Sequence, residues 1–277
     1  MIDGNSALIA HIGYPTSTFK APLIYNPYFE SIGLNAVVMP MGVKAEDFTA
    51  SFAAITRFTN FHGALITMPH KINVMALLDE VSITARIAGA CNAVRKRADG
   101  ALIGDMFDGE GFVRGLARKG LHLAGASALV VGSGGVGSAI AASLAKAGLA
   151  RLMLFDVNEA SAQALAARLA KHYPALQVET GPNDPAGFDL VINATPLGMN
   201  VGDPMPMPIE RIAPTTFVGE VVLKAEMTAF LEAAAARGCR VQVGIDMLFE
   251  MIPAYLEFFG FQTTTPETLR RLAVLPK

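Results

Sequence analysis

The feature that most constrains the fold is a glycine-rich segment, Gly132-Ser133-Gly134-Gly135-Val136-Gly137, between an apolar run and an alanine-rich stretch. The apolar run, 126–131, predicts a buried strand, and residues 137–147 predict a helix. In the pattern G-x-G-x-x-G, the first glycine permits a tight turn, the second lets the backbone approach a pyrophosphate, and the third lets helix and strand pack closely. The helix N-terminus then offers free N–H groups to the phosphates. The segment therefore predicts dinucleotide binding; a glycine-rich turn in an unrelated α/β protein is the alternative.

A carboxylate at the end of the next predicted strand bears on the choice of dinucleotide. Strand 151–156 ends at Asp156, and Asn158 follows closely. A carboxylate in this place accepts hydrogen bonds from the adenosine ribose hydroxyls and would repel a 2′-phosphate. No arginine follows before Arg168, so the segment favours NAD over NADP. The alternative is that Asp156 is a surface side chain that caps the next helix, a role that Asn158 also fits.

Further strand and helix patterns predict that this half of the chain forms a parallel sheet. Strands 189–194, 217–223 and 240–244 alternate with helices 160–172 and 228–237.

Small and polar residues follow the strand at 189–194. We assign Thr195 and Leu197 to the wall of a cofactor crevice, because ligands of parallel sheets collect at the carboxyl ends of the strands. A simple turn set by Pro196 and Gly198 explains the same residues, and the two interpretations are compatible.

The first part of the chain shows the same alternation, which predicts parallel pairing with helices on both faces. The predicted strands are 6–12, 34–39 (ended by Pro40) and 62–68, and the predicted helices are 21–32, 45–58 and 70–79. The boundary between the two parts is expected within helix 109–119 or just after it. The last helices, 245–260 and 266–273, fit either part.

A lysine and an aspartate stand where catalytic groups are expected in such a fold. Lys71 follows the third strand, and Asp108 lies in a glycine-flanked turn. If they meet across a cleft, the carboxylate can hold the lysine while the lysine relays a proton to or from a substrate hydroxyl or carbonyl. Taken singly, each is more often a solvated surface charge. His70 is a weaker candidate base, because it points away from Lys71 in an extended segment.

Composition bounds the class of protein. The 277 residues suit roughly two domains, and a 52% hydrophobic content with a mean hydropathy of +0.41 supplies a large core. The net charge of -2 gives no electrostatic case for nucleic acid or an anionic membrane. Cys91 and Cys239 fit no metal spacing and are expected to be buried free thiols. Without a membrane-span pattern or the basic region of a signal peptide, we expect a cytoplasmic protein.

Several separated motifs resemble those of one family. The segments 67–71, 89–94 and 107–111 resemble the three substrate-domain signatures of shikimate dehydrogenases. The segments that resemble that family's cofactor-domain signatures, in the same order, are 132–137, 193–195 and 244–248.

The resemblance covers nearly the whole chain, and it implies an α/β fold of two domains. An N-terminal α/β substrate domain is expected at 1–112 and a Rossmann dinucleotide-binding domain at 113–244, with a cleft between them. The C-terminal helices, 245–277, are expected to return to the substrate domain.

The resemblance also implies hydride transfer between a nicotinamide and the carbinol carbon of a cyclic hydroxy acid. Lys71 and Asp108 match the family's catalytic pair, and Thr67 and Asn92 match positions that contact the substrate. No metal is implied, and a monomer or homodimer is expected. The remaining cofactor contacts are assigned to Val221 and Gly244.

The sequence departs from the family at positions that hold the substrate. The two serines that bind the shikimate carboxylate fall on Phe19 and Ala21, a tyrosine falls on Leu223, and a glutamine falls on Met251. Each lost hydrogen-bond partner weakens the binding of a buried carboxylate. The family's Asn-Arg-Thr, which favours NADP, is replaced by 156–158.

We therefore expect an NAD-dependent dehydrogenase with intact reaction residues and an altered recognition shell. It is expected to act on a cyclic hydroxy acid or related ring alcohol and not to be optimised for shikimate; with Phe19 and Ala21 at the clasp, the substrate is expected to be less polar. A local shift could still supply hydroxyls from Thr16, Ser17, Thr18 or Tyr25. A true NAD-dependent quinate or shikimate dehydrogenase is the alternative. From another class, a regulatory protein that binds NAD without catalysis is also considered, and the retained Lys71 and Asp108 argue against it.

Overall fold

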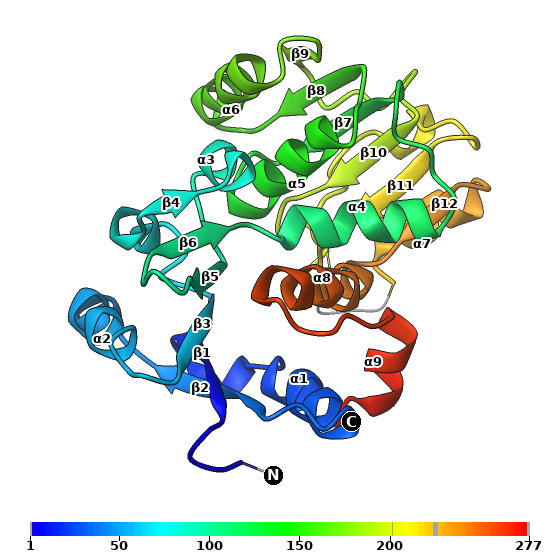
Figure 1. The fold of residues 1–277 in the computed structure, drawn as a ribbon. Coiled ribbons are helices and arrows are strands. Elements are labelled where there is room, and N and C mark those ends of the chain that lie inside the picture. The colour runs from blue at the N-terminus through cyan, green and yellow to red at the C-terminus, as the bar shows by residue number, and fades with distance from the viewer. Residues whose placement is uncertain (1, 201, 224–226, 276–277) are drawn as a thin grey trace. The chain divides into compact units, whose positions relative to one another are not determined.

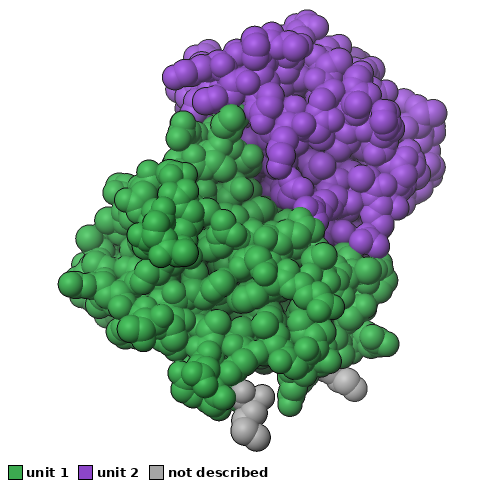
Figure 2. All heavy atoms as spheres, viewed as in Figure 1, with its two compact units in different colours: residues 1–107, 252–277 green, residues 108–251 purple. Residues whose placement is uncertain are grey.

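The chain folds into two compact units in the computed structural model, which describes residues 2–200, 202–223 and 227–275. The first unit holds residues 1–107 and 252–277, and the second holds residues 108–251. Figure 1 shows the elements, and Figure 2 colours the two units. Helix α4 (Asp108–Arg118) lies wholly in the second unit, whereas the residues of helix α8 (Gly244–Phe259) are divided between the two.

The first unit is built on a six-stranded sheet in the order β2-β1-β3-β5-β6-β4. Its strands are β1 (Ala7–Gly13), β2 (Ala36–Gly42), β3 (Phe61–Ile66), β4 (Glu80–Val81), β5 (Ala93–Lys96) and β6 (Leu102–Asp105). β1 pairs in parallel with β2 and β3, but β5 runs antiparallel to both β3 and β6. The predicted parallel pairing is therefore right for the first three strands and wrong for β5, which a hairpin supplies without a crossover.

The β5–β6 hairpin closes through a tight turn, for which the sequence contains a recognisable signal. Arg97 N donates to Ala101 O at 2.9 Å, and Asp99 Oδ1 accepts a hydrogen bond from Ala101 N at 3.0 Å. Gly100 adopts a φ of +90°, in the left-handed region that glycine tolerates. An Asp-Gly pair between two short strands is a strong hairpin signal, so this pairing was readable from the sequence.

The helix predicted at 70–79 is wrong. The structure has only a short 3-10 segment, Asn73–Leu77, followed directly by β4. The carbonyl of Lys71 accepts a hydrogen bond from Cys91 N at 2.8 Å. A bond to Cys91, in the segment between α3 and β5, thus occupies the carbonyl that the first turn of an α-helix would need.

Strand β2 is an edge strand whose free side is partly covered. It continues through Pro40, so the predicted end at this proline is wrong; an edge strand tolerates the missing N–H. Asn26, on helix α1 (Pro22–Ser31), donates from Nδ2 to Val38 O at 3.0 Å and accepts from Val38 N at 2.8 Å. The amide therefore satisfies both backbone groups of one edge residue.

Helices cover both faces of the first sheet. Phe48 and Phe52 of α2 (Phe48–Ile55) pack with Ile12 on one face. On the other, Phe29 of α1 meets Phe261 edge to face at 5.5 Å, and α1 also packs against α9 (Pro266–Leu272). A short helix, α3 (Ile83–Ala88), completes the unit.

The second unit is a doubly wound α/β domain. Its six-stranded sheet has the order β12-β11-β10-β7-β8-β9, and every pair is parallel, as predicted. The strands are β7 (Ser127–Val131), β8 (Arg151–Phe155), β9 (Gln177–Thr180), β10 (Leu190–Asn193), β11 (Phe217–Glu220) and β12 (Arg240–Gln242). Besides α4, the helices are α5 (Gly135–Lys146), α6 (Glu159–His172) and α7 (Ala229–Ala236). The sheet order reverses between β7 and β10, where such folds bind their ligands.

Three properties of the described residues limit the chemistry of the chain. None of their helices is long and apolar enough to cross a membrane. No group of His, Cys, Asp and Glu among them is arranged to hold a metal ion. Cys91 and Cys239 are buried free thiols, as predicted, and burial raises the pKa of the Cys91 thiol to about 12, so that thiol is inert.

Candidate active site

The glycine-rich turn between β7 and α5 has a different steric reason at each glycine. Gly132 has a φ of +106°, and a Cβ at Gly137 would lie 1.9 Å from Gly132 O, so both positions require glycine. Cβ atoms on Gly134 and Gly135 would have no atom within 4 Å. Packing therefore leaves open space at the two middle glycines, where the motif expects a phosphate to approach.

Asp156 binds this turn to the end of the second strand. Its Oδ2 accepts a hydrogen bond from Ser133 N at 2.6 Å, and its Oδ1 accepts one from Asn158 N at 2.8 Å. Each carboxylate oxygen keeps a further lone pair for a ribose hydroxyl. Asp156 does not cap the next helix, which was the alternative interpretation. Asn158 is the N-cap residue of α6, and no side chain makes the capping hydrogen bond.

A cavity of about 490 Å³ opens beside Asp156 in the same unit. Its described lining includes the carboxylates of Asp156 and Glu159, and it has no lysine or arginine. Arg151, at the opposite end of β8, places its guanidinium 4.6 Å from the centre of the Phe188 ring. The one cation of this strand thus lies away from the place where a 2′-phosphate would bind.

The loop after β10 is held by one buried side chain. Asn193 Oδ1 accepts from both Thr195 N (3.1 Å) and Thr195 Oγ1 (2.7 Å), and Asn193 Nδ2 donates to Leu197 O at 2.9 Å. A Cβ at Gly132 would lie 2.8 Å from the Ala194 backbone, so this loop and the glycine turn meet where the sheet order reverses. Residues 193–198 therefore form an ordered turn, which agrees with the structural interpretation of this segment.

Two more predicted cofactor residues meet at the ends of β11 and β12. A Cβ at Gly244 would lie 2.2 Å from Val222 O and 2.8 Å from the Val221 carbonyl carbon, so only glycine fits there. Leu223, a predicted substrate residue, comes directly after Val222, and its side chain is 49% exposed. Met251, on α8, packs its Cβ within 2.6 Å of the position that a Gly111 Cβ would occupy.

In the first unit, the predicted substrate residues Phe19 and Thr67 converge on Gly13. A Cβ at Gly13 would lie 2.3 Å from Thr67 Cγ2 and 3.0 Å from Phe19 Cζ. A 3-10 turn, Thr16–Thr18, sets the loop, and Phe19 N donates to Thr16 O at 3.0 Å. Ala21 is half-buried at the start of α1. The loop that follows β1 therefore lies against the end of β3.

Lys71 and Asn92 lie together beyond the carboxyl end of β3. Lys71 is half-buried, and its carbonyl holds Cys91 N. Asn92 is 1% exposed; its backbone bridges Ile66 and Asp105, and its Oδ1 accepts from Phe107 N at 2.9 Å. The buried Asp108 follows Phe107 directly, at the start of α4.

His70 has a structural role. It is fully buried, its Nε2 donates to Val43 O at 2.7 Å, and its ring stacks on Phe48 at 4.0 Å. These contacts agree with the low weight given to His70 as a base.

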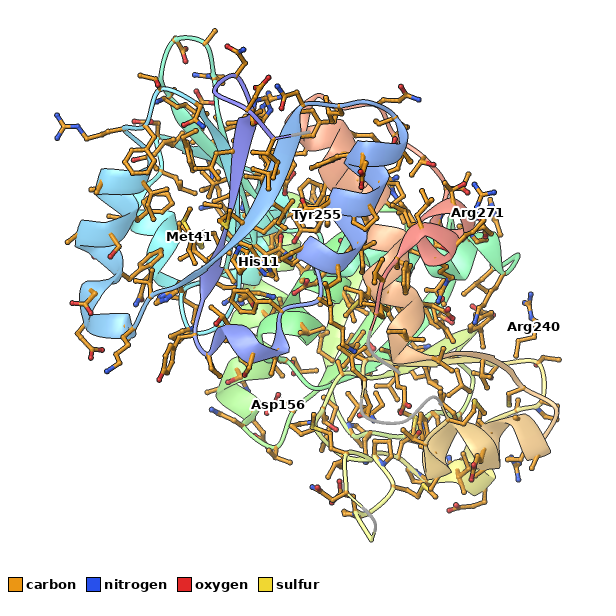
Figure 3. All side chains as sticks on the ribbon, turned by 90° about the horizontal axis from the view of Figure 1, so that it is seen from below. His11, Met41, Asp156, Arg240, Tyr255 and Arg271 are labelled. Atoms are coloured by element: carbon orange, nitrogen blue, oxygen red, sulfur yellow. The ribbon has the colours of Figure 1, made fainter. Side chains whose placement is uncertain are left out.

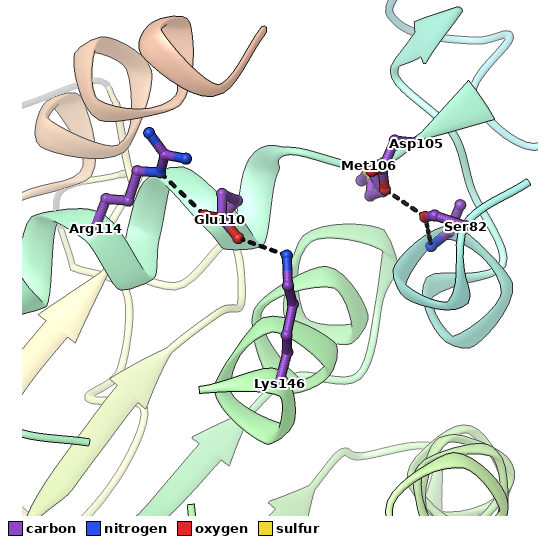
Figure 4. A network of polar contacts seen from close by, with 7 residues as sticks. Ser82, Asp105, Met106, Glu110, Arg114 and Lys146 are labelled. Atoms are coloured by element: carbon purple, nitrogen blue, oxygen red, sulfur yellow. Dashed lines mark hydrogen bonds and ion pairs between the residues drawn. The ribbon is translucent and has the colours of Figure 1, made fainter. Parts of the chain in front are cut away.

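Polar contacts brace the elements that carry these residues (Figure 4). Ser82 caps α3 and donates to Asp105 Oδ1, which also accepts from Met106 N at 2.7 Å. In the second unit, Glu110 pairs with Arg114 at 3.0 Å and with Lys146 at 3.4 Å, which joins α4 to α5.

Two buried titratable residues were missed by the sequence reasoning. His11 (Figure 3) stacks on Phe19 at 4.0 Å, and its buried Nδ1 has no hydrogen-bond partner. Glu220 is fully buried at the end of β11, beside the side chains of Thr228 and Asn193. Burial raises the pKa of Glu220, while the nearby Thr228 and Asn193 side chains lower it less. A titratable residue inside an otherwise apolar strand was the available signal for both.

Comparison with known proteins identifies the family. Residues 11–94 match the shikimate dehydrogenase substrate binding domain. A shikimate dehydrogenase (NADP(+)) of Rubrobacter xylanophilus is 38% identical over 264 residues, which cover 94% of this chain and 93% of that protein. The chain belongs to the shikimate dehydrogenase family. It is thus an oxidoreductase of the alcohol dehydrogenase type, and the predicted enzyme class is confirmed.

Two solved structures share the fold of this chain. Quinate dehydrogenase from Corynebacterium glutamicum in complex with NAD is 30% identical, with a TM-score of 0.85 over 96% of this chain and 98% of that one. The 5-ketofructose reductase of Gluconobacter sp. strain CHM43 is 26% identical, with a TM-score of 0.88 over 98% of each chain. These structures support the predicted two-domain α/β fold class, and the relatives named for NADP(+) together with the NAD complex support the binding of a nicotinamide dinucleotide.

Proposed function

We propose that this shikimate dehydrogenase-like protein transfers a hydride between NAD and a cyclic hydroxy acid or related ring alcohol, with a site that is not optimised for shikimate. One observation carries the proposal. The residues expected to perform the reaction, Lys71 among them, are retained, whereas Phe19 brings a ring and no hydrogen-bonding group to the substrate loop beside Thr67. The chemistry is kept while the recognition of a carboxylate is altered.

The proposed mechanism assigns proton transfer to Lys71. In oxidation, Lys71 Nζ takes the proton of the substrate hydroxyl, and in reduction the ammonium returns it to the developing alkoxide. Asp108 orients the Lys71 ammonium and accepts a hydrogen bond from a substrate hydroxyl. Thr67 and Asn92 hold the ring in place. The nicotinamide, when bound, supplies the carbon that accepts or donates the hydride.

The proposal divides the work between the two parts of the chain. Residues 1–112 and the C-terminal helices 245–277 bind the substrate, and residues 113–244 bind the dinucleotide. Leu223 and Met251 contribute apolar surface to the substrate. A cytoplasmic location and a monomeric or homodimeric state remain predictions.

We propose NAD rather than NADP as the preferred cofactor. The support is the Asp156 carboxylate at the end of β8 and the absence of a lysine or arginine from the described lining of the adjacent cavity. The C. glutamicum relative is a complex with NAD, whereas the R. xylanophilus relative is named for NADP(+). The ratio of kcat/KM for NAD to that for NADP tests the proposal, and a strong preference for NADP contradicts it.

A true NAD-dependent quinate or shikimate dehydrogenase is the second candidate. The names of the R. xylanophilus and C. glutamicum relatives favour it. Such an enzyme must tolerate Phe19 and Ala21 in place of the family's serines. Efficient oxidation of quinate or shikimate at ordinary concentrations distinguishes it from the divergent enzyme.

An oxidation screen separates these functions. Quinate, shikimate, aminoshikimate and related ring alcohols are offered with NAD and with NADP while reduced nicotinamide is followed. Turnover of a ring alcohol that requires Lys71, with weak turnover of shikimate, supports the proposal. If NAD binds, no compound turns over, and Lys71→Ala changes nothing, the protein is instead a regulatory protein that binds NAD.

A further inference from the structure

The substrate loop of the first unit contains an aromatic pair that the motifs do not predict. The rings of His11 and Phe19 stack with centroids 4.0 Å apart and an interplanar angle of 25°. His11 comes from β1, an interior strand of the sheet between β2 and β3, and Phe19 comes from the loop that follows it. A side chain fixed by the sheet thus supports one carried by a loop, and His11 sets the plane of the Phe19 ring.

The pair lies where the substrate is expected. The same Phe19 ring and the methyl group of Thr67 both approach the position that a Cβ on Gly13 would occupy. Thr67 is an expected substrate contact, so the Phe19 ring lines the same end of the site. Phe19 is half-buried, so part of its side chain is accessible to a ligand.

The pair carries no charge near neutral pH. Burial lowers the pKa of His11 to about 4, so its imidazole is neutral. Lys20 follows Phe19 but is exposed to solvent, where a single ion pair is weak. A carboxylate placed against the rings would lose water and gain no charge-assisted hydrogen bond from them.

We propose that His11 and Phe19 form an uncharged aromatic wall that selects ring alcohols and cyclic hydroxy-ketones lacking a carboxylate at that end of the molecule. Phe19 meets the C–H face of the ring, and His11 is a positioning residue that holds Phe19 in place. This inference deepens the proposed function and rests on it.

A matched pair of substrates tests the wall. Shikimate and its methyl ester share the carbinol carbon and the ring hydroxyls but differ in charge; quinate and its methyl ester form a second pair. We expect kcat/KM to favour each ester over its acid by roughly tenfold or more, because the acid loses charge-assisted hydrogen bonds. The preference resides in KM, since the reacting carbon is unchanged.

Three variants locate the effect. The double variant Phe19→Ser with Ala21→Ser restores hydroxyls and should shift the preference toward the acids by tenfold or more. Phe19→Leu keeps an apolar surface without adding a donor, so it should retain the preference for esters. His11→Leu removes the stack and should raise KM for the esters while kcat changes less. The melting temperature of each variant without ligand is the folding control, because all three residues lie in the first unit.

The outcomes separate failure of the wall from failure of the proposed function. A wild-type preference for the free acids, lost in Lys20→Ala, overturns the wall but leaves the dehydrogenase intact. An ester-to-acid ratio that neither His11→Leu nor the double serine variant alters also overturns it. If nothing is oxidised, the proposed function fails, and thermal stabilisation in the presence of NADH decides about the wall. Stabilisation by the esters alone supports it, and stabilisation by the acids or by neither contradicts it.

Discussion

The loop after β10 and the loop after β1 both follow the carboxyl end of a strand, but they differ in their polar contacts. In the first, the Asn193 amide bonds to Thr195 and Leu197, and the glycine turn beside it leaves open space at Gly134. In the second, His11 Nδ1 has no partner and Phe19 brings no polar group. The dinucleotide site can be inferred from groups that are present, the glycine turn and the polar loop beside it. The substrate must be inferred from the polar groups that the loop after β1 lacks.

Removal of the proton relay should produce the largest effect. We expect Lys71→Ala to lower kcat roughly a thousandfold, the usual scale of general acid–base catalysis, while the Kd for NAD stays unchanged. Steady-state kinetics and cofactor titration measure the two quantities. The exposed Lys171, in the second unit, is the matched control. Retention of most of the activity would remove Lys71 from the mechanism.

The glycine turn can be tested with two methyl groups. Gly137→Ala places a carbon 1.9 Å from Gly132 O, and this overpacking should cost about 1–3 kcal/mol in the free energy of unfolding. Gly134→Ala meets no protein atom within 4 Å, so stability should change little while the Kd for NAD rises. Chemical denaturation and cofactor titration compare the two variants. Equal effects of both on stability would contradict the steric explanation.

His11 should make stability depend on pH on the acid side. Burial lowers its folded-state pKa to about 4 from 6.5. The unfolded chain therefore binds the proton first as pH falls, and stability declines from about pH 6.5 to about pH 4. At about 1.4 kcal/mol per pH unit, the loss over this range is about 3.5 kcal/mol. Urea denaturation across this range should show a flatter profile for His11→Leu, whereas His122→Leu, at an exposed site, should match the wild type.

Asp156 should link cofactor choice to the stability of the glycine turn. Asp156→Ala removes the ribose acceptor and also the partners of Ser133 N and Asn158 N. We expect the ratio of kcat/KM for NAD to that for NADP to fall roughly tenfold, the effect of one lost hydrogen bond to a charged group. The melting temperature should fall as well. Asp156→Asn, which keeps one acceptor oxygen, is the milder control, and an unchanged ratio would show that Asp156 does not select the cofactor.

Glu220 should produce the smallest effect, with the opposite sign of pH dependence. Burial raises its folded-state pKa above 4.5, so the folded chain holds the proton longer and stability is lost as pH rises through that pKa. Glu220→Gln should therefore raise the melting temperature by a few degrees at pH 8 and less at pH 4. A lower melting temperature at pH 8 would mean that the ionised carboxylate is stabilising.

Sequence reasoning succeeded where the cause of a structure is local. Gly132 and Gly137 are fixed by a turn and a helix that adjoin them in the chain, and the alternating strands of the second unit fixed its parallel sheet. It failed for 70–79, where Cys91 N, distant in the sequence, takes the carbonyl of Lys71. It also overlooked β5, although the Asp99-Gly100 turn was a local signal for that hairpin. The stack of His11 on Phe19 was invisible because it depends on how a loop folds back onto β1. The meeting of Lys71 with Asp108 stays a prediction.

The pairing of Asn26 with Val38 has a consequence for how copies of this protein can associate. An edge strand invites a second chain to extend the sheet, which is the first step toward fibrils. An incoming strand at β2 would have to displace the Asn26 amide, which already makes the two backbone hydrogen bonds of Val38 that such a strand would make. It would also find no N–H donor at Pro40. Growth by strand addition is thus disfavoured at this edge by the side-chain amide of Asn26 and by the pyrrolidine ring of Pro40.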